Sequence, residues 1–145
     1  MRFHTHLPVQ DLQQSRTFYE ALLGVSPAKE KPDYLKFLTP ELNLAFSPAP
    51  TGYEPPPVHL GFELSNQLEL SQAEDRLRRS GIQVELRDDS VCCYAAQDKF
   101  WVTDPSGYRW ELYVLIEDAD HREDADSKCC LARGKSAESV QSGSA

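Results

Sequence analysis

The segment FHTHLPVQDL, residues 3–12, decides the fold prediction, because the chain changes there from the period of a strand to that of a helix. Residues Arg2–Val9 have strand character, and Asp11 is a good N-cap for a following helix. Apolar side chains then recur at helical spacing as far as Leu23, and Gly24 lies where a helix ends. The segment therefore predicts a strand that leads directly into a helix.

The same transition occurs again 55 residues later, where Val58–Leu64 alternates as a strand before the helical segment Gln67–Ser80. Further strand signals lie at Tyr34–Leu38, Leu42–Phe46, Ile82–Leu86, Gln97–Thr103 and Arg109–Ile116, and the segment around Val91–Ala96, between two of them, is expected to contain a surface loop. We predict an α+β fold of two βαβββ modules, about residues 1–47 and 58–118, with one strand of the first module undetected. The Pro-rich segment 48–57 would link them, and an unrelated α+β domain with two similar halves is the alternative.

Composition excludes several classes of function. A chain of 145 residues favours one domain, and its net charge of −8 argues against binding a nucleic acid. Unbroken apolar runs such as Leu112–Ile116 are too short to cross a membrane, and the first residues lack the apolar run of a secretory signal. We therefore expect a cytoplasmic protein. Residues 119–145 are acidic and then rich in Ser, Gly and Ala, which predicts a disordered tail.

Strand parity places three metal-ligand candidates on the less apolar faces of the predicted strands: His4, His59 and Glu111. Two imidazoles and one carboxylate, with open positions opposite, suit Fe(II) and oxygen chemistry. His6 shares the face of His4, so the pattern does not choose between them. A single histidine on a strand is more often a surface or hydrogen-bonded residue, which is the simpler interpretation of each.

The four cysteines occur as two adjacent pairs, Cys92-Cys93 and Cys129-Cys130. Adjacent cysteines bond to each other only through a strained ring, so the first pair is a poor structural disulfide. Two neighbouring thiolates form a soft clamp for As(III), Cd(II), Zn(II) or Cu(I). Two small buried strand residues are an equally good interpretation of the first pair, and the second pair is either a second capture point or without a role.

Two motifs resemble the vicinal oxygen chelate superfamily, which includes glyoxalases, extradiol dioxygenases and bleomycin-resistance proteins. They are His4-x-x-Leu7-x-Val9-x-Asp11-Leu12 and Asp104-Pro105-x-Gly107-x-x-Trp110-Glu111. The longer string Cys92-Cys93-Tyr94-Ala95-x-Gln97-Asp98-Lys99-x-Trp101-Val102-Thr103 is similar to the ArsI C–As lyases and the related cadmium-induced proteins. The resemblance covers about residues 1–118.

The resemblance implies a cupped mixed sheet around one metal. It also implies Fe(II)- and O2-dependent cleavage of the carbon–arsenic bond in trivalent organoarsenicals such as methylarsonous acid, with release of arsenite. His4, His59 and Glu111 would be the metal ligands, although some relatives carry Gln at the position of His4. Cys92 and Cys93 would bind arsenic. Four further side chains are expected to face the same cavity: Gln97, Lys99, Trp101 and Tyr113.

There are two alternatives to this activity. A non-catalytic thiol module that binds Cd(II) or As(III) would use the cysteines equally well, but it leaves the three metal-ligand candidates without a purpose. Another enzyme of the superfamily, such as a glyoxalase or a thiol transferase acting on fosfomycin, is disfavoured. A glyoxalase would need a second carboxylate on the strand equivalent to that of Glu111, and Leu42–Phe46 offers only Asn43 inside the run. The sequence allows either a monomer or a homodimer.

Overall fold

The computed structural model describes residues 1–88, 91–92 and 95–118. The first half contains β1 (Phe3–Val9), α1 (Leu12–Leu23), β2 (Lys29–Lys31), β3 (Tyr34–Leu38) and β4 (Leu42–Pro48). The second half contains β5 (His59–Glu63), α2 (Gln67–Arg79), β6 (Glu85–Asp88), β7 (Val91–Cys92), β8 (Ala95–Thr103) and β9 (Arg109–Asp118).

This order confirms the prediction of two βαβββ modules. The strand that the pattern missed is β2, which is short, fully exposed and made of Lys29, Glu30 and Lys31. A charged edge strand has no apolar alternation to reveal it. The strand expected at Ile82–Leu86 begins later, at Glu85, and β6 and β7 together occupy the second-strand position of the second module, which β2 holds in the first.

Each module starts its helix in the same way. The Asp11 carboxylate accepts hydrogen bonds from the amides of Gln13 and Gln14, and these bonds, chiefly the one from Gln14, hold the pKa of Asp11 below its ordinary value. Asn66 caps α2 through the amide of Glu69. The histidines His4 and His59 both precede their helix cap by seven residues, so they occupy equivalent positions in the two modules.

The strands form two mixed sheets. Sheet A has the order β1-β4-β3-β2, and sheet B has the order β5-β9-β8-β6 with β7 paired to β8. The pairs β1–β4 and β5–β9 are parallel, and the other pairs are antiparallel. The single cupped sheet that the resemblance implied is therefore divided in the described chain, because β1 and β5 are each an edge strand and do not pair with each other.

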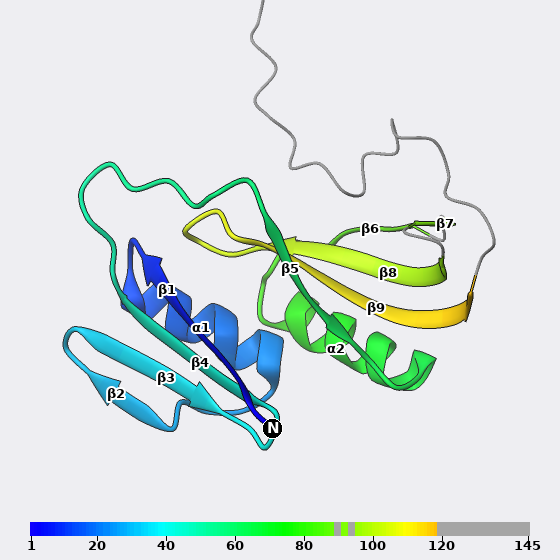
Figure 1. Cartoon of the computed structure of the whole chain (residues 1–145), viewed down its shortest axis with the longest axis horizontal. Helices are drawn as coiled ribbons and strands as arrows, with labels where there is room; N and C mark the ends of the chain where they lie inside the picture. The colour runs from blue at the N-terminus through cyan, green and yellow to red at the C-terminus, as the bar shows by residue number, and fades with distance from the viewer. Residues whose placement is uncertain (89–90, 93–94, 119–145) are drawn as a thin grey trace, which may run out of the picture.

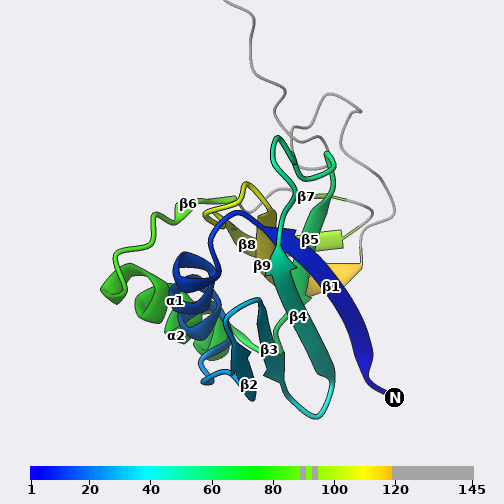
Figure 2. The ribbon, with the colours of Figure 1, turned by 90° about the vertical axis from the view of Figure 1, so that its left-hand side faces the viewer.

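Both helices pack on the same side of the strands, as Figure 2 shows. The strand surface turned away from α1 and α2 is called the outer face of each sheet below. The modules are joined at the buried Tyr19, whose hydroxyl donates to Asp104 Oδ2 at 2.8 Å and accepts from Trp110 Nε1 at 3.1 Å. Burial raises the pKa of Tyr19 well above its ordinary value, so the hydroxyl keeps its proton and remains a donor.

A second link joins the two helices. Arg76 of α2 donates from Nε to the carbonyl of Ala21 at 2.6 Å and from Nη2 to that of Leu22 at 3.0 Å. These carbonyls lie in the last turn of α1, where backbone acceptors lack intrahelical partners. The helix then ends at Gly24, whose φ of 68° is the left-handed conformation that glycine adopts without strain. The two helices are thus tied together at the end of α1.

In the described ranges, neither helix has the length and apolar composition required to cross a membrane.

Candidate metal site

His59 and Glu111 lie together on the outer face of sheet B. His59 is the first residue of β5, and Glu111 of β9 lies opposite Gly61, two residues further along β5. The distance from His59 Nε2 to Glu111 Oε1 is 3.8 Å, and the side chains are 37% and 15% exposed. An imidazole nitrogen and a carboxylate oxygen therefore meet at a position that a small ligand can reach.

Gly61 makes room for the Glu111 carboxylate. A Cβ at position 61 would lie 2.7 Å from Glu111 Cγ, which is closer than real Cβ contacts, and 3.0 Å from the Glu111 backbone oxygen, which is tighter than most of them. The Glu111 side chain thus lies across the strand at the one residue without a side chain, and this directs its carboxylate toward His59. The sequence reasoning did not identify Gly61, although a glycine inside a strand is a known signal of close approach.

Trp101 and Arg109 hold the orientation of His59. The Trp101 ring contacts the His59 ring edge to face with 5.2 Å between centroids, and the Arg109 guanidinium lies 4.1 Å from the Trp101 centroid. Arg109 in turn donates to Glu85 Oε2 at 3.0 Å. The sequence reasoning placed Trp101 beside the site but missed Arg109, which is the first residue of β9 and lies opposite His59.

The pair fits two ligands of one divalent ion. The 3.8 Å separation is too long for a hydrogen bond, but two donors that bind one ion at about 2.1 Å each can lie up to about 4.2 Å apart. Imidazole nitrogen and carboxylate oxygen suit Fe(II) and related divalent ions. Within the described ranges, however, no cluster contains three side chains of His, Cys, Asp or Glu that could hold a metal.

His4 lies on the outer face of sheet A. Its ring is exposed, and Nδ1 lies 3.0 Å from the carbonyl oxygen of Asn43. A carbonyl only accepts, so Nδ1 carries the proton that it donates, and the neutral ring presents its lone pair at Nε2. This is the arrangement typical of metal-binding histidines, in which the second ring nitrogen is anchored by a backbone carbonyl or carboxylate.

In His6, the alternative ligand, the ring nitrogen that forms a hydrogen bond is Nε2 and not Nδ1. His6 Nε2 lies 3.0 Å from Ser47 Oγ, and the ring packs edge to face against Tyr34 with 6.3 Å between centroids. Nε2 is the nitrogen that His4 leaves free. The geometry therefore favours His4 over His6 as a ligand.

The structure does not bring His4 beside the pair within one chain. In Figure 1, β1 begins at the N-terminus at the lower end of the molecule, whereas the linker enters β5 at the upper end. In the described ranges, His4 therefore forms no cluster of three ligands with His59 and Glu111.

Lys99 is the most unusual polar residue of the outer face of sheet B. It is 0% exposed, and its Nζ has no hydrogen-bond partner in the part of the chain that the structure describes. It lies opposite Tyr113, whose hydroxyl donates to Glu63 Oε2 at 3.0 Å. Burial, reinforced by Glu63, raises the pKa of Tyr113.

The remaining predicted site residues are placed as follows. Gln97 lies opposite Leu115 on the same outer face, and Cys92 ends β7 opposite Ala95. Cys93, Cys129 and Cys130 lie outside the described residues. The predicted tail at 119–145 also lies outside them.

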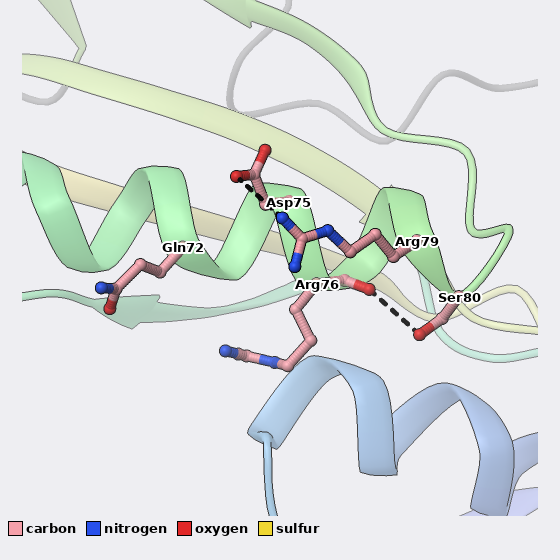
Figure 3. Close-up of a pocket in the computed structure, with 5 residues that line it drawn as sticks. All are labelled: Gln72, Asp75, Arg76, Arg79 and Ser80. Carbon is pink, nitrogen blue, oxygen red and sulfur yellow. Dashed lines mark hydrogen bonds and ion pairs between the residues drawn. The ribbon is translucent and has the colours of Figure 1, made fainter.

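A surface depression on α2 has a different character (Figure 3). Its Arg76 is engaged with carbonyls of α1, and Asp75 pairs with Arg79 at 3.9 Å. Its five lining residues include neither histidine nor cysteine: Gln72, Asp75, Arg76, Arg79 and Ser80. It lies on the helical side of the molecule and does not compete with the outer face of sheet B as a metal site.

Comparisons with known proteins agree with this architecture. The sequence model of the Glyoxalase/Bleomycin resistance protein/Dioxygenase superfamily matches residues 3–112. The trivalent organoarsenical cleaving enzyme of Thermomonospora curvata is 40% identical over 135 residues, which cover 91% of this chain and 89% of that protein. The cadmium-induced protein CadI of Mycobacterium tuberculosis is 36% identical over 141 residues, which cover 89% and 92%.

The fold has solved counterparts as well. The crystal structure of a glyoxalase/bleomycin resistance protein/dioxygenase from Alicyclobacillus acidocaldarius superposes with a TM-score of 0.67 at 19% identity. The superposition covers 81% of this chain and 92% of that one. At this identity the likeness concerns the fold alone.

Proposed function

Because the chain belongs to the Glyoxalase/Bleomycin resistance protein/Dioxygenase superfamily, we propose that it cleaves the carbon–arsenic bond of trivalent organoarsenicals and releases arsenite. Fe(II) is the proposed cofactor and O2 the proposed co-substrate. The observation that supports this proposal best is the His59–Glu111 pair on an accessible outer face. The family supplies the class of chemistry, and the trivalent organoarsenical cleaving enzyme at 40% identity supplies the substrate class.

The first step is capture of the substrate by Cys92 and Cys93. Each thiol transfers its proton to one hydroxyl of the trivalent arsenical, so two S–As bonds form, two As–O bonds break and two waters leave. The organic group is then the one remaining carbon substituent on arsenic. Capture through sulfur binds the substrate at a point remote from the bond that breaks, which orients that bond without using the metal ligands.

His59 and Glu111 would hold the metal, and Trp101 and Gly61 fix the directions of these two side chains. When bound, Fe(II) supplies open coordination positions and the redox chemistry that O2 requires. The carboxylate also lowers the net charge of the site, which a neutral imidazole does not do.

Lys99 stabilises negative charge on oxygen during the reaction. Its side chain is buried on the same outer face as Glu111, and its amino group has unused hydrogen-bonding capacity in the described structure. A buried donor that is already in place costs little reorganisation when charge develops near it. An unpaired buried amino group is otherwise a cost to stability, which favours a role in function.

The decisive experiment is release of arsenite from methylarsonous acid and from a trivalent aromatic arsenical by the full chain. We expect turnover with Fe(II) under air and none under strict anaerobiosis. Glu111→Gln should lose turnover and keep stoichiometric capture of the arsenical, whereas Cys92→Ser should lose capture. Cys129→Ser is the matched control and should retain both. Turnover without O2, or full activity of Cys92→Ser, would contradict the proposal.

A second candidate function is capture of Cd(II) or As(III) without catalysis. The 36% identity to a cadmium-induced protein favours it, and the vicinal cysteines would serve it equally well. Tight Cd(II) binding that persists in Glu111→Gln, together with no arsenite from either arsenical, would establish this function in place of cleavage.

A further inference from the structure

We propose that the segment leading into β5 is a strap that positions His59, and that Tyr53 anchors it. The strap consists of residues 53–58, directly before His59. Figure 1 shows this segment passing beside the turn between β8 and β9 on its way into β5. The inference rests on the proposed metal at His59 and Glu111, and it adds a positioning residue from the segment that joins the two modules.

The anchor is a hydrogen bond between two tyrosines. Tyr108 is 3% exposed and donates to the carbonyl of Pro8, near the end of β1, at 3.1 Å. The hydroxyl oxygens of Tyr53 and Tyr108 lie 2.8 Å apart. Tyr108 has one hydroxyl proton and gives it to Pro8, so Tyr53 is the donor in this second bond. One hydroxyl therefore joins the strap, the first module and the start of β9.

The strap also packs against the turn between β8 and β9. A Cβ at position 107 would lie 3.3 Å from Pro55 Cγ, so the strap contacts the turn at Gly107, which has no side chain. The turn is held in shape by Asp104, whose Oδ1 accepts from the amides of Ser106 and Tyr108 at 2.9 and 2.8 Å. The strap is therefore fixed to the turn from which β9 starts.

The strap is stiff between its anchor and His59. Residues 55–57 are three consecutive prolines, whose rings fix φ at about −65°. The amide of Val58 then donates to the carbonyl of Pro56 at 2.7 Å, which closes a tight turn directly before His59. A stiff segment transmits the position of its fixed end, which a flexible segment does not do. The anchor at Tyr53 thus sets the place where β5 begins.

The strap and β9 extend from the same anchor to the two proposed ligands. Arg109 follows Tyr108 directly and lies opposite His59 in the pairing of β5 with β9. Glu111 comes two residues later, and its Oε1 lies 3.8 Å from His59 Nε2. His59 is the first residue of its strand, and the ends of strands open more easily than their centres. The anchor therefore holds His59 in register with Glu111.

Tyr53→Phe isolates the contribution of the anchor. The Tyr53 ring is partly buried and packs against the core, and phenylalanine keeps this packing. The bond from Tyr108 to Pro8 also remains, because Tyr108 is its donor. The variant thus removes the hydrogen bond of the strap and little else. Tyr34→Phe on sheet A is the matched control, since it makes the same chemical change far from the strap in the sequence.

The first test is hydrogen–deuterium exchange of the metal-free full chain, followed by mass spectrometry. We expect the amides of β5 to exchange about 5- to 10-fold faster in Tyr53→Phe, because one lost hydrogen bond shifts a local opening equilibrium by about that factor. Exchange in α1 and β3 should keep the wild-type rate, and Tyr34→Phe should leave β5 unchanged. Wild-type exchange in β5 of Tyr53→Phe, or an equal increase in α1 and β3, would overturn the inference.

The second test is the affinity of the folded full chain for Co(II), measured by equilibrium dialysis. We expect Tyr53→Phe to bind Co(II) about 5- to 10-fold more weakly and Tyr34→Phe to stay within about twofold of the wild type. A loss of overall stability alone does not change the affinity of a chain that remains folded, so this measurement separates positioning from a general structural role. Wild-type affinity in Tyr53→Phe would overturn the inference.

A further variant tests the stiffness of the strap with the anchor intact. Replacing Pro56 and Pro57 together by glycine should also lower the affinity for Co(II) about 5- to 10-fold, because the strap then no longer fixes the start of β5. Pro32→Gly, in the turn between β2 and β3, is the control and should stay within about twofold. Wild-type affinity in the double glycine variant would contradict a stiff strap.

The outcomes separate this inference from the proposed function. If the wild type binds Co(II) and Tyr53→Phe changes neither exchange nor affinity, the strap is wrong while the metal at His59 and Glu111 stands. If the wild type binds no Co(II), the metal-based function is wrong, and faster exchange confined to β5 in Tyr53→Phe still supports the strap as the anchor of that strand.

Discussion

The outer faces of the two sheets have the same topology and different chemistry. On sheet A, His4 and His6 are exposed and hydrogen-bonded to groups of the neighbouring β4. On sheet B, Glu111 is largely covered and Lys99 is fully buried without a hydrogen-bond partner in the described structure. The two sheets therefore have equivalent backbones but different outer faces. The histidines of sheet A form hydrogen bonds with the neighbouring strand, whereas sheet B has polar side chains that can bind a ligand.

This difference indicates that the two modules have different roles, although their topology is the same. Buried polar groups without partners reduce stability, so a face that retains one is under a constraint other than folding. Sheet B holds the carboxylate, the oriented imidazole and the fully buried lysine, whereas sheet A holds two hydrogen-bonded imidazoles and one buried amide oxygen without a partner in the described structure, Asn43 Oδ1.

Glu111→Ala gives the second module the residue that the first module has at the equivalent position, Ala45. We expect the affinity for Co(II) to fall by more than about 100-fold and arsenite release to be lost, because the one carboxylate of the ligand set is removed. Equilibrium dialysis and the arsenite assay measure the two effects. Glu63→Ala, on the same face, should retain the metal, since Glu63 accepts from Tyr113. Equal losses of metal affinity in both variants would show that Glu111 has no special role in binding the metal.

Lys99→Met tests whether the buried amino group serves the reaction. We expect turnover to fall about 10- to 100-fold with metal affinity unchanged, while the free energy of unfolding rises by about 1–3 kcal/mol because an unpaired buried donor is removed. Kinetics, equilibrium dialysis and urea denaturation measure these quantities. Lys36→Met on sheet A is the control and should leave turnover at the wild-type level. A loss of stability in Lys99→Met would indicate a structural lysine.

Gly61→Ala tests the space that holds the Glu111 carboxylate. The new Cβ would lie 2.7 Å from Glu111 Cγ, so the carboxylate must move away from His59. We expect metal affinity to fall about 10-fold, the lower part of the range for residues that orient ligands. Far-UV circular dichroism should show an intact fold. Unchanged metal affinity would mean that the Glu111 side chain can move away from the new Cβ and still bind the metal.

His6→Ala should have the smallest effect. It removes the contact with Ser47 and the packing against Tyr34, which costs about 0.5–1.5 kcal/mol of stability, and it leaves metal affinity and turnover within about twofold. His4→Ala on the same face should lower metal affinity more than His6→Ala does, because the hydrogen bond to Asn43 leaves Nε2 of His4 free to bind a metal. The reverse result would show that His6 is the ligand and that the Asn43 carbonyl does not select His4.

Sequence reasoning was most successful where the signal is local. Asp11 and Gly24 cap a helix as the pattern predicts, and the repeated strand-to-helix transition predicted two modules. The sequence pattern did not predict β2, because a short charged edge strand has no alternation of apolar and polar residues. It also placed the start of β6 too early. Gly61 and Arg109 were missed because their roles depend on which residues lie opposite them in β9 and β5.

The sequence by itself determined the module order and the composition of the ligand set, since strand parity, helix caps and residue types are properties of adjacent positions. Only the tertiary structure decided that His59 and Glu111 meet, because strand register sets that pairing. Only the tertiary structure showed that His4 does not join them in a cluster of three ligands within the described ranges, because the packing of the two modules depends on contacts between distant residues. The orientation of the two modules relative to each other depends on these contacts between distant residues, so no local sequence pattern predicts it.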